Sequence, residues 1–390
     1  MSKWRKVKLK NIAMRKLEYG SGASAIEYDG QIRYIRITDI NESGRLNNDP
    51  VSPSTVDEKY KLKEGDILFA RSGATVGKTF LYHKENGPCI YAGYLIRLVP
   101  NEKVANSKYV YYYTKTPIYQ AFIESNKRVV AQPNINAQQY GELEIPLPPL
   151  DIQRIIAQKM NTATELLAMR KQQLAELNNL IKSTFYDMFG DPVTNEKRWE
   201  MKQLSRCCYI NPKKSEIDNF TDNFQVSFIA MPSVSINGDI DTTEIRDYID
   251  VKKGFTYFYE NDVLFAKITP CMENGKGAIA RNLKNNIGFG STEFHVLRPI
   301  EGVSNSEWLY RLTVLSVFRE NAENNMSGSA GQKRVPTSFF DKFIISLPPF
   351  PLQNQFAEIV TKIEEQKALV KKAIDETQYL FDSLMSDYFE

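Results

Sequence analysis

Residues 145–153 read Ile-Pro-Leu-Pro-Pro-Leu-Asp-Ile-Gln, and residues 345–353 read Ile-Ser-Leu-Pro-Pro-Phe-Pro-Leu-Gln. The similarity continues without a gap, at an offset of 200 residues, to the end of the 390-residue sequence. Between 145–190 and 345–390, 14 of 46 positions are identical, whereas average residue usage gives roughly three identities by chance. The chain therefore contains an internal duplication, and a duplication describes architecture before any single motif does.

The duplication extends upstream into two globular segments, where its offset changes. Glu64–Arg71 (Glu-Gly-Asp-Ile-Leu-Phe-Ala-Arg) matches Glu260–Lys267 at an offset of 196, and Gly77-Lys78 matches Gly275-Lys276 at an offset of 198. Small insertions in loops explain the change, since loops tolerate altered length. We therefore expect two similar globular domains, each followed by a similar C-terminal segment.

Each C-terminal segment is predicted to be one long helix. Residues 152–189 contain no Gly or Pro, and apolar residues recur in them at seven-residue intervals, as in helices that pack against another helix. Asp151 is a candidate N-cap, Gly190 a stop signal, and Pro351 suits a first helical turn. Docking of both helices on globular cores, without helix pairing, stays open as a second interpretation. The predicted coiled-coil packing residues are Met160, Leu167, Leu174, Leu177, Ile181, Val360, Ile363, Val370, Ile374, Phe381 and Leu384.

The globular segments indicate short strands mixed with helices. Their aromatic runs, Tyr109–Tyr113 and Phe255–Tyr259, are expected mainly to fill cores and sheet faces, with a minority free to stack on bases or sugars. Strand-like runs are 31–37, 67–70, 94–99, 263–266 and 293–297, which are rich in β-branched and aromatic residues.

Basic and polar residues stand beside turn residues at matching places in the two halves. Such loops can approach a phosphate backbone or enter a DNA groove, where Arg and Gln suit base edges and Lys and Ser suit phosphates. Simple solvation of each basic residue is the competing interpretation. The candidate DNA-binding residues are Arg71, Ser72, Lys78, Lys127, Arg128 and Gln132 in the first half, and Lys267, Thr269, Lys276, Gln332, Lys333 and Arg334 in the second.

No catalytic or metal-binding motif stands out. The run Gly73–Thr79 resembles a phosphate-binding P-loop, but three residues separate its glycines where that loop needs four. Only two histidines exist, His83 and His295, and the four cysteines form no Cys-x-x-Cys pair, so zinc-like spacings and duplicated histidine triads are missing. We expect neither catalysis nor a metal site in this chain.

Bulk properties restrict the class of protein only loosely. The net charge is +3, with 42% hydrophobic and 25% charged residues, so a polyanionic partner has to be argued from local patches. No apolar run of about 18 residues and no apolar N-terminal segment occur, which predicts a cytoplasmic protein without a membrane span.

The combination of these motifs resembles the specificity subunits of Type I restriction-modification systems. It consists of Gly-Asp-Ile-Leu-Phe-Ala-Arg, a Gly-Lys turn and Leu-Pro-Pro-x-x-x-Gln before a long helix, all occurring twice over nearly the whole chain. In that family a Glu often precedes the Gln, whereas here Ile152 and Leu352 stand at that position. This departure leaves the interpretation of the helix start intact.

The resemblance implies an α+β protein with pseudo-twofold symmetry. Two target-recognition domains, 1–150 and 191–350, would each read one half of a bipartite DNA sequence, and spacer helices 151–190 and 351–390 would form an antiparallel coiled coil. Two methyltransferase subunits would carry S-adenosylmethionine, and motor/endonuclease subunits would use ATP and Mg. A coiled-coil scaffold with two protein-binding domains is the main alternative, and a fused methyltransferase-endonuclease is a third.

Overall fold

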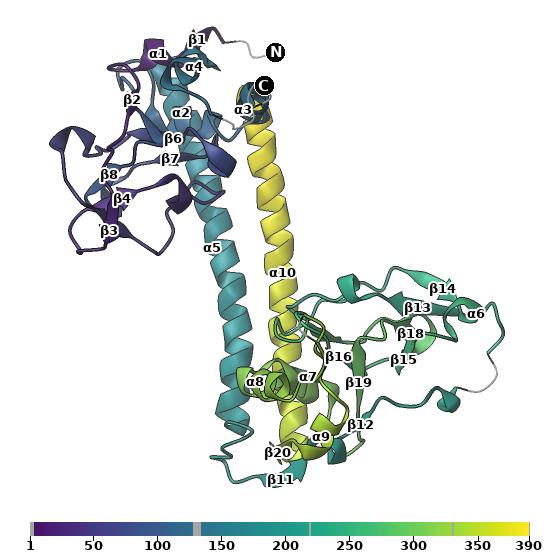
Figure 1. The fold of residues 1–390 in the computed structure, drawn as a ribbon. Helices are drawn as coiled ribbons and strands as arrows, with labels where there is room; N and C mark the ends of the chain where they lie inside the picture. The colour runs from purple at the N-terminus through teal and green to yellow at the C-terminus, as the bar shows by residue number, and fades with distance from the viewer. Residues whose placement is uncertain (1–3, 128–133, 218–219, 330, 390) are drawn as a thin grey trace. The chain divides into compact units, whose positions relative to one another are not determined.

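The computed structural model describes residues 4–127, 134–217, 220–329 and 331–389 (Figure 1). By packing, the chain divides into two compact units. Unit 1 comprises Met1–Lys171 with Lys372–Glu390, and unit 2 comprises Gln172–Lys371. Each unit therefore combines one globular segment with half of each long helix. The sequence-based ranges follow the order of the chain and count each helix as a separate segment.

Both long helices form, each with 40 residues: α5 spans Leu150–Phe189 and α10 spans Phe350–Phe389 (teal and yellow in Figure 1). Gly190 adopts a φ of 74° and donates its N–H to the Tyr186 carbonyl at 2.8 Å. A glycine in this left-handed conformation closes a helix, so the stop signal is confirmed.

α5 begins earlier than the predicted N-cap indicated. Asp151 lies inside the first turn, so its assignment as the N-cap was wrong. The helix begins at Leu150 because the Pro149 carbonyl already accepts the Gln153 N–H, at 3.0 Å. Pro351 lies in the first turn of α10, as expected.

The buried Gln of each Leu-Pro-Pro-x-x-x-Gln motif fastens its helix to the globular segment of the same unit. Gln153 accepts the Asn106 N–H through Oε1 at 2.8 Å and donates from Nε2 to two carbonyl oxygens, at 3.1 and 2.8 Å. Gln353 does the same with the Asn305 N–H at 3.1 Å and two carbonyls, both at 2.9 Å. Both side chains are fully buried, so the repeated motif is a repeated junction.

Within each unit, half of α5 packs against half of α10 in the antiparallel sense. In unit 1 the N-terminal half of α5 meets the C-terminal half of α10, where Lys159 donates to the Tyr388 hydroxyl at 2.8 Å. In unit 2 the opposite halves meet, and the Phe185 and Phe356 rings lie 5.7 Å apart. The predicted pairing of the helices is confirmed.

The predicted coiled-coil packing residues, which form the seam between the two helices, differ in burial. Met160, Leu167, Ile181, Val360, Ile363 and Val370 are buried, whereas Leu174, Leu177, Ile374, Phe381 and Leu384 are half-buried. Towards the helix ends the buried positions shift by one residue, to Phe185, Phe189, Met385 and Phe389.

Unit 1 is built around one four-stranded antiparallel sheet with the order β2-β9-β6-β7. Smaller pairs join β1 with β10 and β3 with β5 in the antiparallel sense, and β4 with β8 in the parallel sense. Its strands are β1 Lys6–Lys8, β2 Glu18–Tyr19, β3 Ala25–Glu27, β4 Arg33–Ile35, β5 Val51–Pro53, β6 Ile67–Ala70, β7 Thr79–Leu81, β8 Cys89–Tyr91, β9 Leu95–Leu98 and β10 Glu144–Pro146. Its shorter helices are α1 Leu9–Ile12, α2 Ser107–Tyr113, α3 Pro117–Lys127 and α4 Ala137–Glu142.

Unit 2 repeats this plan with its own sheet, β12-β19-β16-β17, and its own terminal pair, β11 with β20. A second four-stranded sheet, β14-β13-β18-β15, contains a parallel pair, β13 with β18, as unit 1 has in β4 with β8. The strands are β11 Glu200–Gln203, β12 Cys208–Ile210, β13 Gln225–Ile229, β14 Ile245–Asp247, β15 Thr256–Tyr259, β16 Val263–Ala266, β17 Gly277–Ile279, β18 Ile287–Gly290, β19 Phe294–Pro299 and β20 Ile344–Leu347. The helices are α6 Tyr248–Val251, α7 Ser306–Val314, α8 Ser316–Asn324 and α9 Ser338–Lys342.

The repeated Leu-Phe-Ala run forms the central strand of each unit. In β6, Ile67 and Phe69 face the core that includes the long helices, while Leu68 and Ala70 face the outer core beneath β4 and β8. The corresponding residues of β16 divide between two cores in the same way. A strand buried on both faces reads as a continuous apolar run, which explains why this stretch is similar in both halves. The five predicted strand regions are confirmed: 67–70 and 263–266 have the predicted ends, whereas the ends of the other three are shifted.

Candidate nucleic-acid interface

In unit 1 the loop after β6 lies against the segment that precedes α4. The Arg71 carbonyl accepts the Ile135 N–H at 2.9 Å, and Ser72 forms a β-bridge with Asn134. The Arg71 guanidinium donates to the Asn134 side chain at 3.3 Å and lies over the Tyr19 ring, 4.8 Å from its centre. In unit 1 the loop that carries Arg71 and Ser72 therefore lies beside Asn134 and Ile135, which follow the predicted residue Gln132 in the sequence. Arg128 and Gln132 lie outside the described residues.

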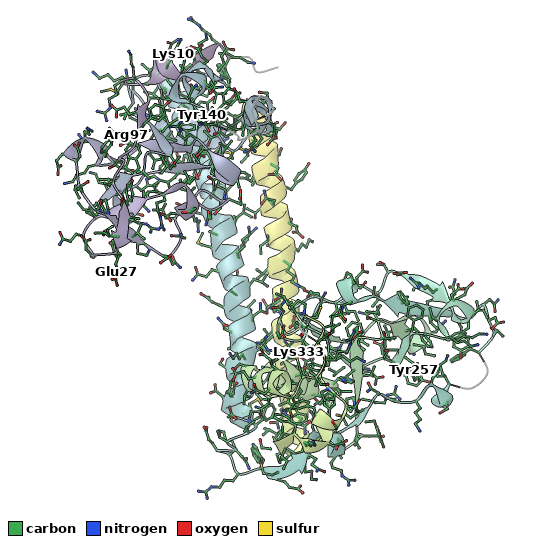
Figure 2. The ribbon with its side chains drawn as sticks, in the orientation of Figure 1. Lys10, Glu27, Arg97, Tyr140, Tyr257 and Lys333 are labelled. Carbon is green, nitrogen blue, oxygen red and sulfur yellow. The ribbon has the colours of Figure 1, made fainter. Side chains whose placement is uncertain are left out.

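In unit 2 the equivalent loop, after β16, lies against the segment that precedes α9. The Lys267 carbonyl accepts the Val335 N–H at 2.9 Å, and the Thr269 N–H donates to the Lys333 carbonyl at 3.1 Å. Lys333 is exposed (labelled in Figure 2). In unit 2, candidates that are far apart in sequence therefore share one local surface, and in unit 1 the loop after β6 pairs with the segment before α4 in the same manner.

Buried side chains hold these loops at their first and last residues. In unit 1 the Tyr140 hydroxyl (labelled in Figure 2) donates to the Ala70 carbonyl at 2.9 Å, directly before Arg71. In unit 2 His295 Nε2 lies 2.8 Å from the Val335 carbonyl, directly after Arg334. Because a carbonyl only accepts, Nε2 carries the proton, and burial lowers the pKa of this imidazole to about 4.

Three of the predicted basic residues are already paired with carboxylates. Lys78 pairs with Glu42 at 2.8 Å, Lys127 with Glu124 at 2.7 Å, and Arg334 with Glu293 at 2.9 Å. The Arg334 guanidinium also lowers the pKa of Glu293. These side chains can reach a phosphate only by leaving their partners, so their positive charge is largely compensated within each unit.

The remaining candidates differ in exposure. Thr269 and Lys276 are half-buried, and the Thr269 hydroxyl donates to Glu273 at 3.3 Å, whereas Gln332 is exposed beside Lys333. The sequence analysis did not single out Tyr19 and Asn134, whose side chains contact Arg71. It also did not single out a basic stretch of unit 2 at Lys252–Phe255. That stretch was visible in the sequence as Lys-Lys-Gly-Phe but has no counterpart in the first half.

Two kinds of feature are absent from the described part of the chain. No helix there is both long enough and apolar enough to cross a membrane. No group of three or more His, Cys, Asp or Glu side chains among those residues could hold a metal ion.

The chain matches a known protein-family model over most of its length. Residues 1–179 and 196–378 match the model of the Type I restriction modification DNA specificity domain. The two matched stretches correspond to the two halves of the internal duplication.

Specificity subunits of Type I restriction enzymes are among the proteins to which this chain is similar. The Type I restriction enzyme EcoAI specificity subunit of Escherichia coli is 35% identical over 239 residues, which cover 60% of this chain. The chain matches only 38% of that subunit's length. The EcoKI specificity subunit of Escherichia coli (strain K12) is 24% identical over 371 residues, or 87% of this chain and 77% of that one. The solved Type-I restriction-modification S subunit from M. genitalium shares the fold, with a TM-score of 0.59, 14% identity, and coverage of 100% of this chain and 96% of that chain.

Proposed function

The chain belongs to the family of Type I restriction-modification DNA specificity subunits, because that family model matches most of its length, and we propose that it is the sequence-reading subunit of such a complex. In this proposal the chain binds double-stranded DNA, and each unit reads one half of a bipartite target. The chain has no catalytic site of its own and selects the DNA on which partner subunits act.

The observation that carries the proposal is the loop arrangement that occurs twice. Each unit presents the loop after its central strand together with the segment before α4 or α9, and each arrangement carries basic and amide side chains. A two-domain DNA reader needs two similar surfaces whose base-contacting residues differ, since base edges in the major groove specify sequence while phosphates only position the protein. Arg71 and Asn134 stand at this surface in unit 1, and Lys267 and Lys333 stand there in unit 2.

Chemistry on the DNA belongs, in this proposal, to other subunits. Two methyltransferase subunits dock on this chain and carry S-adenosylmethionine, and motor/endonuclease subunits use ATP and Mg. The internal duplication supports a stoichiometry of two methyltransferases, because an approximate twofold repeat presents the same surface twice.

The paired helices act as a spacer that sets the distance between the half-sites. A straight 40-residue helix is about 60 Å long at 1.5 Å per residue, which exceeds the roughly 34–36 Å of one DNA turn. Helix length would therefore decide how many unread base pairs separate the two half-sites.

The test is a genome-wide map of methylated adenine in cells that express this chain with its methyltransferase, compared with cells that lack the chain. The expected result is a bipartite motif that disappears with the chain. Unchanged methylation while the methyltransferase is active would contradict the proposal and favour a scaffold with two protein-binding domains. The scaffold would also show no dependence of duplex binding on salt, whereas release of counterions gives a DNA reader a steep dependence.

A further inference from the structure

Unit 2 contains a small cleft beside the loop that follows β16. The cleft has a volume of about 240 Å³, and its wall includes the segment that follows β12, the start of β15, and Lys267. This is roughly eight times the ~30 Å³ that one water occupies in the liquid, enough for a phosphate and part of its sugar. Its lining residues include Asn211, Lys214, Phe255, Tyr257, Lys267 and Phe294.

Two lysines line the cleft, and Glu293, whose pKa is lowered by Arg334 and in part by the charge of Lys267, offsets some of their positive charge. Lys252 pairs with Asp222 and Arg334 with Glu293, whereas neither Lys214 nor Lys267 forms an ion pair with a carboxylate that the structure describes. The pKa of Lys214 is lowered, first by burial and then by the neighbouring charges of Lys252 and Lys253. An anion placed beside Lys214 would relieve this repulsion.

The rim of the cleft carries an exposed aromatic ring. Phe255 is 36% exposed although it belongs to the residue types most often buried. It follows Gly254, whose φ of 84° forms a turn directly after Lys252 and Lys253. The Arg246 guanidinium stacks on Phe228, 3.4 Å from the ring centre, and lies 5.9 Å from the centre of Phe255. Arg246 therefore flanks Phe255, with its charge paired to Glu244 at 2.6 Å.

The aromatic rings of the cleft, Phe255 and Tyr257, have no aromatic counterpart at the corresponding positions of unit 1. The ungapped match between Glu64–Arg71 and Glu260–Lys267 places Lys59 and Lys61 where unit 2 has Phe255 and Tyr257. Lys59 pairs with Asp57, and Lys61 with Glu58, so the aromatic rim is replaced by lysines paired with carboxylates. A feature present in only one unit can affect only the half-site that this unit reads.

We infer that this cleft binds one nucleotide of the DNA strand next to the half-site read by unit 2, with the phosphate between Lys214 and Lys267 and Phe255 packed against the sugar or base. The inference rests on the proposed function and deepens it. Cationic side chains beside an aromatic ring match the two parts of a nucleotide, since amines hold phosphates and rings stack on bases without regard to sequence. Lys267 belongs to the cleft and to the loop surface already described, so the two contacts would be continuous.

The experiment measures duplex affinity against salt concentration for the full chain assembled with its methyltransferase, on DNA that carries the mapped bipartite site. Lys214→Ala should weaken binding about tenfold at low salt and reduce the salt slope by about one, as expected when one phosphate contact is lost. Lys214→Arg should restore both values. Phe255→Ala should weaken binding without changing the salt slope.

Lys342→Ala is the matched control, because Lys342 is an exposed lysine of unit 2 on α9 that does not line the cleft. It should change neither value, and all variants should preserve the sequence of both methylated half-sites. A Lys214→Ala variant with the affinity and slope of Lys342→Ala would overturn the inference. Failure of the unmodified complex to bind its mapped site would instead refute the proposed function.

Discussion

At the residue scale, the buried Gln of each helix junction is a sharp stability determinant. Replacing Gln353 by Ala leaves the Asn305 N–H and the Val303 and Pro348 carbonyls without partners. Because unsatisfied buried polar groups cost about 1–3 kcal/mol each, we expect unit 2 to lose about 3 kcal/mol of unfolding free energy. Denaturant unfolding followed by the fluorescence of the buried Trp308 measures the loss.

The neighbouring Gln355 provides a control for this junction. Gln355 is exposed on the same helical turn, and its replacement by Ala should change stability by less than about 0.5 kcal/mol. Equal stability of the Gln353→Ala and Gln355→Ala variants would show that the junction does not fasten the helix.

His295 should make the stability of unit 2 dependent on pH. Burial lowers its folded pKa to about 4, whereas an unfolded histidine titrates near 6.5. The unfolded chain therefore binds a proton first, so the contribution is complete above about pH 6.5 and is lost progressively as the pH falls towards 4. At pH 5 the loss should be about 2 kcal/mol relative to pH 7.

The measurement compares the change in unfolding free energy between pH 7 and pH 5 for the unmodified chain and for His295→Gln. Only the difference between the two changes reports His295, because carboxylates titrate in both proteins. If both proteins lose the same stability between these pH values, His295 does not titrate as the structure requires.

The sequence predicted that the candidate loops occupy equivalent places in the two units, but it did not predict most of the ion pairs that their residues form. Matching loops at 71–78 and 267–276 were visible through the duplication, and they occupy equivalent places. Of the three compensated cations, only Lys127 has a partner that spacing indicates, because residues three apart on a helix are neighbours. The carboxylates that pair with Lys78 and Arg334 come from other loops, so only the folded chain brings them together.

At the element scale, the heptad pattern predicted helix pairing but misplaced the ends of the seam. A straight α-helix drifts about 20° per heptad relative to a strict seven-residue repeat. Over several heptads the buried face therefore moves to the next residue, which is why Met385 is buried where Leu384 was expected. Sequence periodicity shows that two helices pair, whereas the drift of the seam depends on how far each helix supercoils.

Lengthening both helices together should change the spacing of the DNA half-sites and nothing else. Seven residues inserted in α5 after Lys171 and in α10 after Lys371, the boundaries of the two units, add about 10.5 Å and nearly two complete helical turns. Since base pairs rise 3.4 Å, the unread spacer should grow by about three base pairs. Sequencing of methylated adenine gives the new spacing.

A single insertion in α5 alone is the control for the spacer. It shifts one side of the seam against the other and should abolish methylation or reduce it strongly. An unchanged spacing in the doubly lengthened chain would refute the role of the helices as a spacer, and so would an altered half-site sequence.

At the scale of the whole molecule, the duplication carried most of the fold prediction. Both units have the same order of strands in the central sheet and the same antiparallel terminal pair, as the shared motifs indicated. The outer parts differ, with two separate pairs in unit 1 and one four-stranded sheet in unit 2. This difference could not be predicted, because the outer strands have only short sequence signals and no similarity between the halves.

If the two units read DNA separately, substitutions in them should act on different half-sites and combine additively. Arg71→Ala removes a guanidinium from the loop surface of unit 1, and Lys333→Ala removes an amine from that of unit 2. Each should weaken binding about tenfold, because one base contact contributes about 1–3 kcal/mol of discrimination. Residues without shared partners add within about 0.5 kcal/mol, so the double variant should weaken binding about a hundredfold. Duplexes altered in one half-site at a time measure each contribution, with thermal unfolding as the check that both variants stay folded. A single substitution that relaxed both half-sites would mean that the units read DNA jointly, and the division of the target between them would be wrong.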